Sequence, residues 1–153
     1  LVAADREMAF ALCAEVPPGA WRLADRFWPG PLTLVLPAAP GVPPEIAAGG
    51  TVGVRVPGSE TARELARLAG GPLVSTSANL AGEPPVARVE DLDPRLVTRV
   101  DAVLDGGPVR GGLPSTVVEV GRQGPQLVRE GAVSWEEIRA ALRDAERPPG
   151  RSG

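Results

Sequence analysis

The run from residue 51 to residue 57 alternates between apolar and other side chains and carries one arginine, Arg55. Because successive side chains of a strand point to opposite faces, its three valines share one face. Arg55 then shares the other face with Thr51 and Gly53. A guanidinium between a hydroxyl and a glycine is well placed to bind a carboxylate or a phosphate. From these residues alone, a surface arginine of an edge strand is an equally good interpretation.

A second polar segment follows the short apolar run Pro72-Leu73-Val74, and it consists of residues 75–79, Ser-Thr-Ser-Ala-Asn. Open α/β sheets bind ligands at strand ends, so we interpret this segment and Arg55 as the floor of a small-molecule anion site. Hydroxyl and amide side chains also cap turns and satisfy backbone groups. That purely structural use is the more common one, and it stays open here.

The composition excludes several kinds of chemistry. All 16 basic residues are arginines, and the sequence has no lysine, histidine or tyrosine. A Ser-His-Asp triad, a histidine metal site, a Walker lysine and a Schiff-base lysine are therefore impossible in this sequence. The net charge of −3 argues against extensive nucleic-acid binding, although it leaves room for one basic groove.

The length of 153 residues, 43% of them hydrophobic, fits one domain with a real core. No apolar run is long enough to span a bilayer, and the first residues show no signal-peptide pattern. A single cysteine, Cys13, excludes an internal disulfide framework and is compatible with a cytoplasmic location. We interpret Cys13 as a small buried hydrophobic residue.

The periodicity predicts an α/β domain with a mixed sheet, because helices and strands alternate early and strands cluster late. Ser134 and Glu137 have the spacing of a capping box at the start of the last helix. The predicted helices are 5–16, 20–27, 60–68, 89–97 and 134–145, and the predicted strands are 32–36, 51–57, 73–75, 102–104, 115–120 and 126–129. We expect one domain over residues 1–146 and a disordered tail over 147–153.

Over roughly residues 20–135 the chain resembles the YrdC-like family of threonylcarbamoyl-adenylate synthases. The matching motifs occur in the order of the family. They are Arg26–Leu36 (RFWPGPLTLVL), Val52–Pro57 (VGVRVP), Gly71–Asn79 (GPLVSTSAN), Gly82–Pro85 (GEPP), Asp105–Gly107 (DGG), Pro114–Val118 (PSTVV) and Val128–Val133 (VREGAV).

This resemblance implies a twisted open mixed sheet with flanking helices. It also implies a reaction that joins L-threonine, bicarbonate or CO₂, and ATP into threonylcarbamoyl-AMP and pyrophosphate for the t6A modification of tRNA. The resemblance assigns threonine binding to Arg55, Ser75 and Ser115. It assigns ATP binding to Thr51, Ser77, Pro85 and Arg129.

Further expectations concern the surroundings of these residues. Asn79 is expected to brace its loop, and Trp28 to belong to the scaffold. Arg110, between glycines, is a candidate phosphate contact. Any Mg²⁺ would arrive with ATP and be held largely by its phosphates. The tRNA and a downstream threonylcarbamoyl-transferase protein are candidate partners, and no membrane partner is expected.

The chain departs from the family in ways that keep a second hypothesis open. The family's opening Thr/Tyr-Gly-Leu strand and Lys-x-Arg-Pro loop are missing, so we expect an N-terminally incomplete domain with little synthase activity. Glu130 places an anion beside Arg129. The alternative function is a non-catalytic YrdC-like module that binds a nucleotide or RNA.

Overall fold

The computed structural model describes residues 1–108, 113–121 and 123–143. The chain divides into two compact units, each described here by itself. The sheet unit comprises Leu1–Val74 and Leu113–Gly153, and the loop unit comprises Ser75–Gly112. The single domain expected over residues 1–146 stays a prediction, and the expected tail over 147–153 lies outside the described residues.

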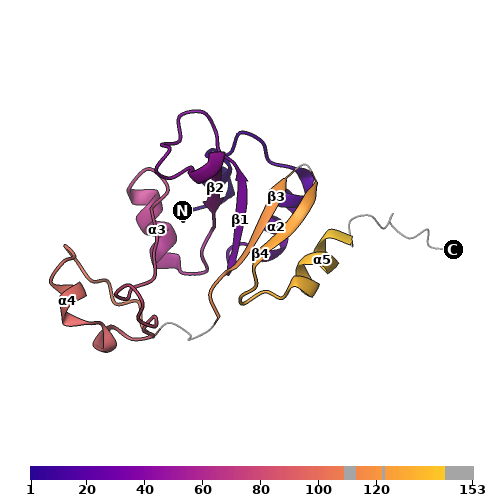
Figure 1. Cartoon of the computed structure of the whole chain (residues 1–153). Helices are drawn as coiled ribbons and strands as arrows, with labels where there is room; N and C mark the ends of the chain where they lie inside the picture. The colour runs from indigo at the N-terminus through magenta and orange to yellow at the C-terminus, as the bar shows by residue number, and fades with distance from the viewer. Residues whose placement is uncertain (109–112, 122, 144–153) are drawn as a thin grey trace. The chain divides into compact units, whose positions relative to one another are not determined.

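The sheet unit is built on a sheet of four strands (Figure 1). The sheet is mixed, as the sequence predicts. Its strands are β1 (Leu32–Pro37), β2 (Thr51–Val54), β3 (Thr116–Gly121) and β4 (Gly124–Arg129), in the order β2-β1-β3-β4. Strand β1 pairs antiparallel with β2 and parallel with β3, and β3 pairs antiparallel with β4. The parallel pairing brings together segments that are about 80 residues apart in the chain.

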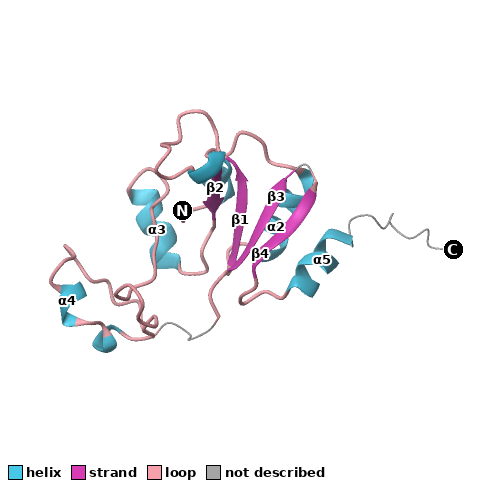
Figure 2. Ribbon diagram, in the orientation of Figure 1, coloured by secondary structure: helices cyan, strands magenta, loops and turns pink. Residues whose placement is uncertain are grey.

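One face of this sheet is buried because its strands alternate with period two. The inward residues of β1 are Leu32, Leu34 and Leu36, and all three are fully buried. Helices α2 (Pro18–Phe27) and α5 (Trp135–Arg143) supply core residues against this face, and Figure 2 shows α2 behind the strands. The opposite face keeps half-buried side chains, so it is the face that can receive a ligand.

Helix α1 (Arg6–Phe10) is shorter than the helix predicted over residues 5–16. Its start is as expected for an N-cap, since the Asp5 carboxylate accepts from the Met8 N–H at 2.8 Å. Beyond the helix, the N–H of Ala14 donates to the Pro37 carbonyl, and the N–H of Ala39 donates to the Leu12 carbonyl. These tertiary hydrogen bonds replace the helical ones, so the helix ends early.

Helix α2 begins at Pro18, two residues before the predicted start, because proline is tolerated in the first turn of a helix. The predicted starts of α3 (Glu60–Leu68) and α5 are confirmed by their caps. In α3, the Ser59 hydroxyl accepts from the Ala62 N–H at 3.3 Å. At α5, the Glu137 N–H donates to the Ser134 hydroxyl at 3.2 Å, and the Ser134 N–H donates to the Glu137 carboxylate at 2.9 Å. This is the reciprocal pair of a capping box. The predicted extension of α5 to residue 145 lies outside the described residues.

The loop unit has less regular structure than the sequence predicts. The single helix predicted over 89–97 is two short turns, η2 (Val89–Asp91) and α4 (Pro94–Val97). Pro94 causes the break, because a residue before proline disfavours helical backbone and Asp93 caps a new start instead. The strand predicted over 102–104 is wrong, since the structure assigns those residues to no strand.

The strand predicted over 73–75 is also reduced, to one bridge between Leu73 and Val2. The remaining element is the 3₁₀ turn η1 (Ala48–Gly50), which leads into β2. Among the helices in the described part of the chain, none is long and apolar enough to cross a membrane.

Candidate functional site

Arg55 directly follows β2 on the open face of the sheet and is half-buried. Its Nε donates to the Gly30 carbonyl at 2.9 Å, and burial lowers the pKa of its guanidinium. In the described residues, no carboxylate forms an ion pair with it. The backbone of Arg55 forms an isolated bridge to residues 1–3, next to β2, which is an outer strand of the four-stranded sheet. A guanidinium held through Nε leaves its outer nitrogens available to an anion.

Ser115 and Arg129 lie in contact, as neighbours at the ends of β3 and β4. The Nη2 atom of Arg129 donates to the Ser115 carbonyl at 2.9 Å and lies 3.4 Å from the Ser115 hydroxyl oxygen. Arg129 is exposed, whereas Ser115 is half-buried. The family resemblance assigns these two residues to different ligands, and the structure brings them together.

The segment after Arg129 is fixed by the fully buried hydroxyl of Thr116. That hydroxyl accepts from the N–H groups of Gly131 at 2.9 Å and Val133 at 3.0 Å, and it donates to the Val133 carbonyl. A Cβ on Gly131 would lie 2.0 Å from the Pro114 carbonyl oxygen, so only glycine fits there. This close approach anchors the end of β4 beside Ser115.

Glu130 has a structural partner of its own, although it follows Arg129 in the sequence. Its carboxylate accepts from the Trp135 N–H at 2.7 Å, at the first residue of α5. A carboxylate at a helix start is favourable, because unpaired N–H groups and the helix dipole both attract it. Glu130 therefore serves the start of α5, and the hydrogen bonds of Arg129 go to Ser115.

Thr33 is a site residue that the sequence analysis missed, although it lies within the motif PGPLTLVL. Its hydroxyl lies 3.0 Å from that of Ser115. Leu34 pairs with Val54, so one step further along the antiparallel register Thr33 lies opposite Arg55. The alternation of side chains along this strand could have identified Thr33, because the alternation that buries Leu34 turns Thr33 toward the open face.

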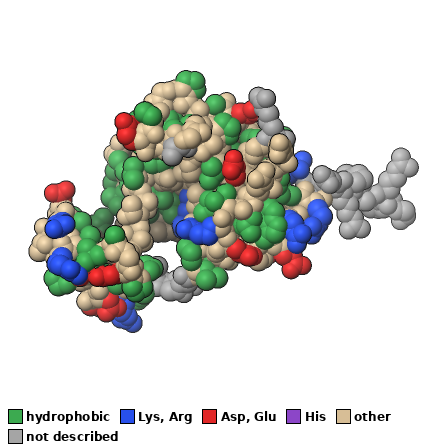
Figure 3. Space-filling model, viewed as in Figure 1, with side chains coloured by type: hydrophobic (Ala, Val, Ile, Leu, Met, Phe, Trp, Pro, Cys, Tyr) green, Lys and Arg blue, Asp and Glu red, His purple; other side chains and the backbone are tan. Residues whose placement is uncertain are grey.

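We call Thr33, Arg55, Ser115 and Arg129 the hydroxyl–arginine cluster. It lies at the end of the sheet where strands β1 and β3 begin and strands β2 and β4 finish (Figure 1). In the space-filling view, arginine side chains are exposed at this end of the sheet (Figure 3). Two guanidinium groups and two hydroxyls can bind an anion by donating several hydrogen bonds to it.

Thr51 shares the face of Arg55 but not its position. Thr51 pairs with Pro37, at the opposite end of β2. Four residues of extended strand place Thr51 about 13 Å from Arg55. One small anion cannot contact both residues, but a longer ligand lying along the strand can.

Three predicted site residues, Ser75, Ser77 and Pro85, belong to the loop unit, where all three are exposed. Their roles stay predictions. The bracing role expected for Asn79 is confirmed, because its Nδ2 donates to the Leu80 carbonyl at 2.9 Å and to the Glu83 carbonyl at 2.8 Å. The candidate Arg110 lies outside the described residues.

Trp28 belongs to the scaffold, as the sequence predicts. Its indole Nε1 donates to the Leu32 carbonyl at 2.6 Å, and its ring lies 5.5 Å from that of Phe10. Cys13 is half-buried against the same core, as a partly buried hydrophobic residue. Among the described residues, no group of three or more cysteine, aspartate and glutamate side chains is placed to hold a metal ion.

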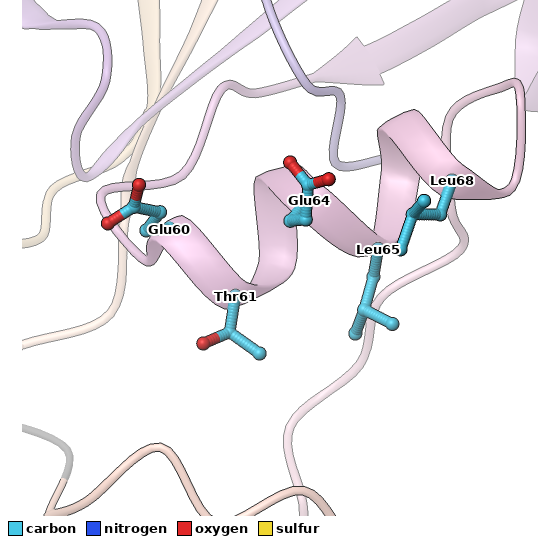
Figure 4. A pocket seen from close by; sticks show the side chains of 5 residues that line it. All are labelled: Glu60, Thr61, Glu64, Leu65 and Leu68. Carbon is cyan, nitrogen blue, oxygen red and sulfur yellow. The ribbon is translucent and has the colours of Figure 1, made fainter.

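A separate open hollow of about 490 Å³ lies along α3 (Figure 4). Its lining residues are Glu60, Thr61, Glu64, Leu65 and Leu68. The two carboxylates and the absence of a basic lining residue make this surface unsuited to an anion. We therefore place the anion site at the hydroxyl–arginine cluster rather than here.

Comparison with known proteins identifies the family. The Sua5/YciO/YrdC family, described as "Telomere recombination", matches residues 1–131. The chain belongs to this family. A threonylcarbamoyl-AMP synthase of Pyrococcus abyssi is 39% identical over 89% of this chain, and one of Bacillus subtilis is 38% identical over 86%. The chain spans 40% and 38% of the lengths of these two relatives.

Solved structures of the Sua5/YciO/YrdC family agree with this fold. Pyrococcus abyssi Sua5 in complex with L-threonine matches 92% of this chain, with a TM-score of 0.84 and 38% identity, over 42% of its own length. Escherichia coli YciO matches 88% of this chain, with a TM-score of 0.75 and 29% identity, over 66% of its own length. The mixed sheet and its flanking helices are thus the fold of this family.

Proposed function

We propose that this chain carries part of the substrate site of an L-threonylcarbamoyladenylate synthase, a nucleotidyltransferase. The names of its relatives support this activity, and so does the threonine complex of Pyrococcus abyssi Sua5. The observation that carries the proposal is Arg55, a half-buried guanidinium held at Nε by Gly30 beside two hydroxyls. A site of this kind suits an anionic ligand, and the carboxylate of L-threonine is one.

In the proposed reaction, the amine of L-threonine first reacts with CO₂, which releases a proton, or with bicarbonate, which releases water, to form a carbamate. A carbamate oxygen then attacks the α-phosphorus of ATP. The bond from that phosphorus to the β-phosphate bridging oxygen breaks, and pyrophosphate leaves. The products are threonylcarbamoyl-AMP and pyrophosphate. A carbamate is a weak nucleophile, so this step needs positioning and charge neutralisation more than a protein base.

The proposed roles of the residues are those that the family resemblance implies. Arg55, Ser75 and Ser115 bind threonine, and Thr51, Ser77, Pro85 and Arg129 bind ATP. The distance of Thr51 from Arg55 along β2 suits a nucleotide that lies along the open face. Arg129 contacts Ser115 and so connects the two ligands. Mg²⁺ carried with ATP would be held largely by the phosphates and would neutralise part of their charge.

The product would serve t6A modification of tRNA in the cytoplasm, through a transferase protein that accepts the activated threonylcarbamoyl group.

Residues 1–153 alone are proposed to have low synthase activity with L-threonine and ATP. A triphosphate calls for several clustered cations, whereas this sequence has no lysine and a net charge of −3. A Lys-x-Arg-Pro loop joined upstream should raise threonine-dependent pyrophosphate release. If the extended chain binds both ligands without any turnover, the non-catalytic nucleotide-binding module replaces the enzyme.

The decisive experiment is calorimetric titration of the Arg55→Ala variant with L-threonine and, separately, with ATP. Loss of a charge-assisted pair should weaken threonine binding by about 10- to 100-fold and leave ATP binding nearly unchanged. Arg22→Ala is the matched control, since Arg22 is an exposed arginine of α2, away from the cluster. An equal loss of both ligands in Arg55→Ala would show that Arg55 does not select threonine.

A further inference from the structure

Thr33 lies between Arg55 and Ser115 on the inner strand β1, and its neighbours Leu32 and Leu34 are fully buried. The two branches of its side chain face different strands. Its methyl Cγ2 lies 3.6 Å from the point where a Cβ on Gly53 would be, and its Oγ1 lies 3.0 Å from the Ser115 Oγ. A β-branched side chain has few χ1 rotamers, so these two contacts fix the direction of the hydroxyl.

The hydrogen bonds around Ser115 determine what that serine can bind. A serine hydroxyl has one hydrogen to donate and two lone pairs that accept, whereas a guanidinium only donates. Arg129 lies 3.4 Å from the Ser115 oxygen and can only donate to it. If Thr33 also donates to that oxygen, both lone pairs are occupied. The hydrogen of Ser115 then points away from the protein partners and can reach only a ligand that accepts.

We propose that Thr33 is a positioning residue, which donates its hydroxyl hydrogen to Ser115 and thereby holds Ser115 as a donor to an anionic oxygen of threonine. This inference rests on the proposed function and adds a residue to it. A carboxylate or carbamate oxygen only accepts hydrogen bonds, so it matches a serine held in this orientation. A neutral hydroxyl or amide ligand would gain less from the same arrangement.

The test uses Thr33→Val, which replaces the hydroxyl with a methyl group of similar shape. The loss of one hydrogen bond should weaken L-threonine binding by about 2- to 12-fold and change ATP binding less than twofold. Thr33→Ser keeps the hydroxyl and should restore most of the threonine affinity. Thr61→Val is the matched control, because Thr61 is exposed on α3, and it should bind both ligands normally.

A double-mutant cycle separates positioning from a general structural effect. On a Ser115→Ala background, Thr33→Val should cause no further loss of threonine binding, because the serine that it orients is gone. An undiminished loss on that background, or an equal loss of ATP binding, would overturn the positioning role. If Thr33→Val does not fold, Thr33→Ala replaces it in the same cycle.

The two proposals can fail separately. If the unsubstituted chain binds no L-threonine, both the proposed function and the role of Thr33 are overturned. If the unsubstituted chain binds L-threonine and Thr33→Val binds it equally well, only the role of Thr33 is overturned.

Discussion

At the scale of single residues, the hydroxyl–arginine cluster concentrates hydrogen-bond donors on one side of the sheet. Arg55 is held at Nε by Gly30, and Ser115 lies within hydrogen-bond distance of both Thr33 and Arg129. Rigid strands orient these groups before any ligand arrives, so little ordering cost remains at binding. Small changes to one hydroxyl should therefore be measurable as changes in affinity.

Ser75 and Ser77 make a reciprocal pair for such a measurement in the loop unit. Ser77→Ala should weaken ATP binding by about 2- to 12-fold, the cost of one hydrogen bond, and leave threonine binding nearly unchanged. Ser75→Ala should do the reverse. Calorimetric titration of both variants with both ligands checks this prediction, and each variant controls for the other. The opposite pattern would mean that the two serines exchange their assigned ligands.

Cys13 should be an unreactive thiol in the folded protein. Burial raises its pKa from 9.0 to about 11, and its Sγ lies 3.7 Å from the Ala9 carbonyl oxygen. Between these two pH values the unfolded chain loses the thiol proton and the folded chain keeps it. Stability from this group is therefore present below pH 9 and falls as the pH rises toward 11.

Thiolate absorbance during a pH titration measures this pKa directly. We expect a midpoint near 11 in the native protein and near 9 in denaturant. Alkylation at neutral pH should likewise be slower in the native protein, because the thiolate is the reactive form. Coinciding native and denatured midpoints would contradict the prediction.

At the scale of elements, caps and close contacts hold the cluster in register. The Thr116 hydroxyl ties β3 to the segment after β4, and Gly131 permits the close approach. Glu130 and Ser134 then start α5, which packs on α2 under the buried face. The contacts of Thr116 and the start of α5 thus hold the end of β4 in place, and they hold the backbone of Arg129 with it.

The capping box of α5 can be tested by Ser134→Ala. Removing the cap should lower the free energy of unfolding by about 0.5–2 kcal/mol, and Ser134→Asp should retain most of the stability. Hydrogen bonds from Ser134 lower the pKa of Glu137 below its usual 4.5. The contribution of Glu137 is therefore present above pH 4.5 and lost as the pH falls through the lower folded pKa.

Urea unfolding followed by circular dichroism, at neutral and at acidic pH, measures both effects. The difference in stability between Ser134→Ala and the unsubstituted chain should shrink in acid, because the two hydrogen bonds from Ser134 weaken when the Glu137 carboxylate loses its charge. A difference that stays constant with pH would show that Glu137 takes no part in the cap.

At the scale of the whole molecule, the proposed ligands should stabilise the fold. A ligand that binds only the folded state at about 100 times its Kd adds about 2.7 kcal/mol to the free energy of unfolding. For a chain of this size, that corresponds to a rise in Tm of about 5–10 °C. We expect this rise with L-threonine, measured by calorimetric melting, and a much smaller one with D-threonine. Equal shifts with both enantiomers would indicate non-specific stabilisation.

The sequence by itself determined the features that depend on local spacing. The two-residue period of β2 placed Arg55 opposite the buried valines, and the three-residue spacing of Ser134 and Glu137 placed the cap of α5. These patterns act within one strand or one turn, so neighbouring residues suffice to predict them. The order of motifs along the chain likewise indicates the family from the sequence alone.

Only the tertiary structure decided which side chains meet. The hydroxyls of Thr33 and Ser115 are 82 residues apart in the chain, and the parallel pairing of β1 with β3 brings them together. Helix α1 ended early for a similar reason, since its neighbours form hydrogen bonds to the chain after β1. Strand register is set by the packing of a whole face, and no local pattern records it.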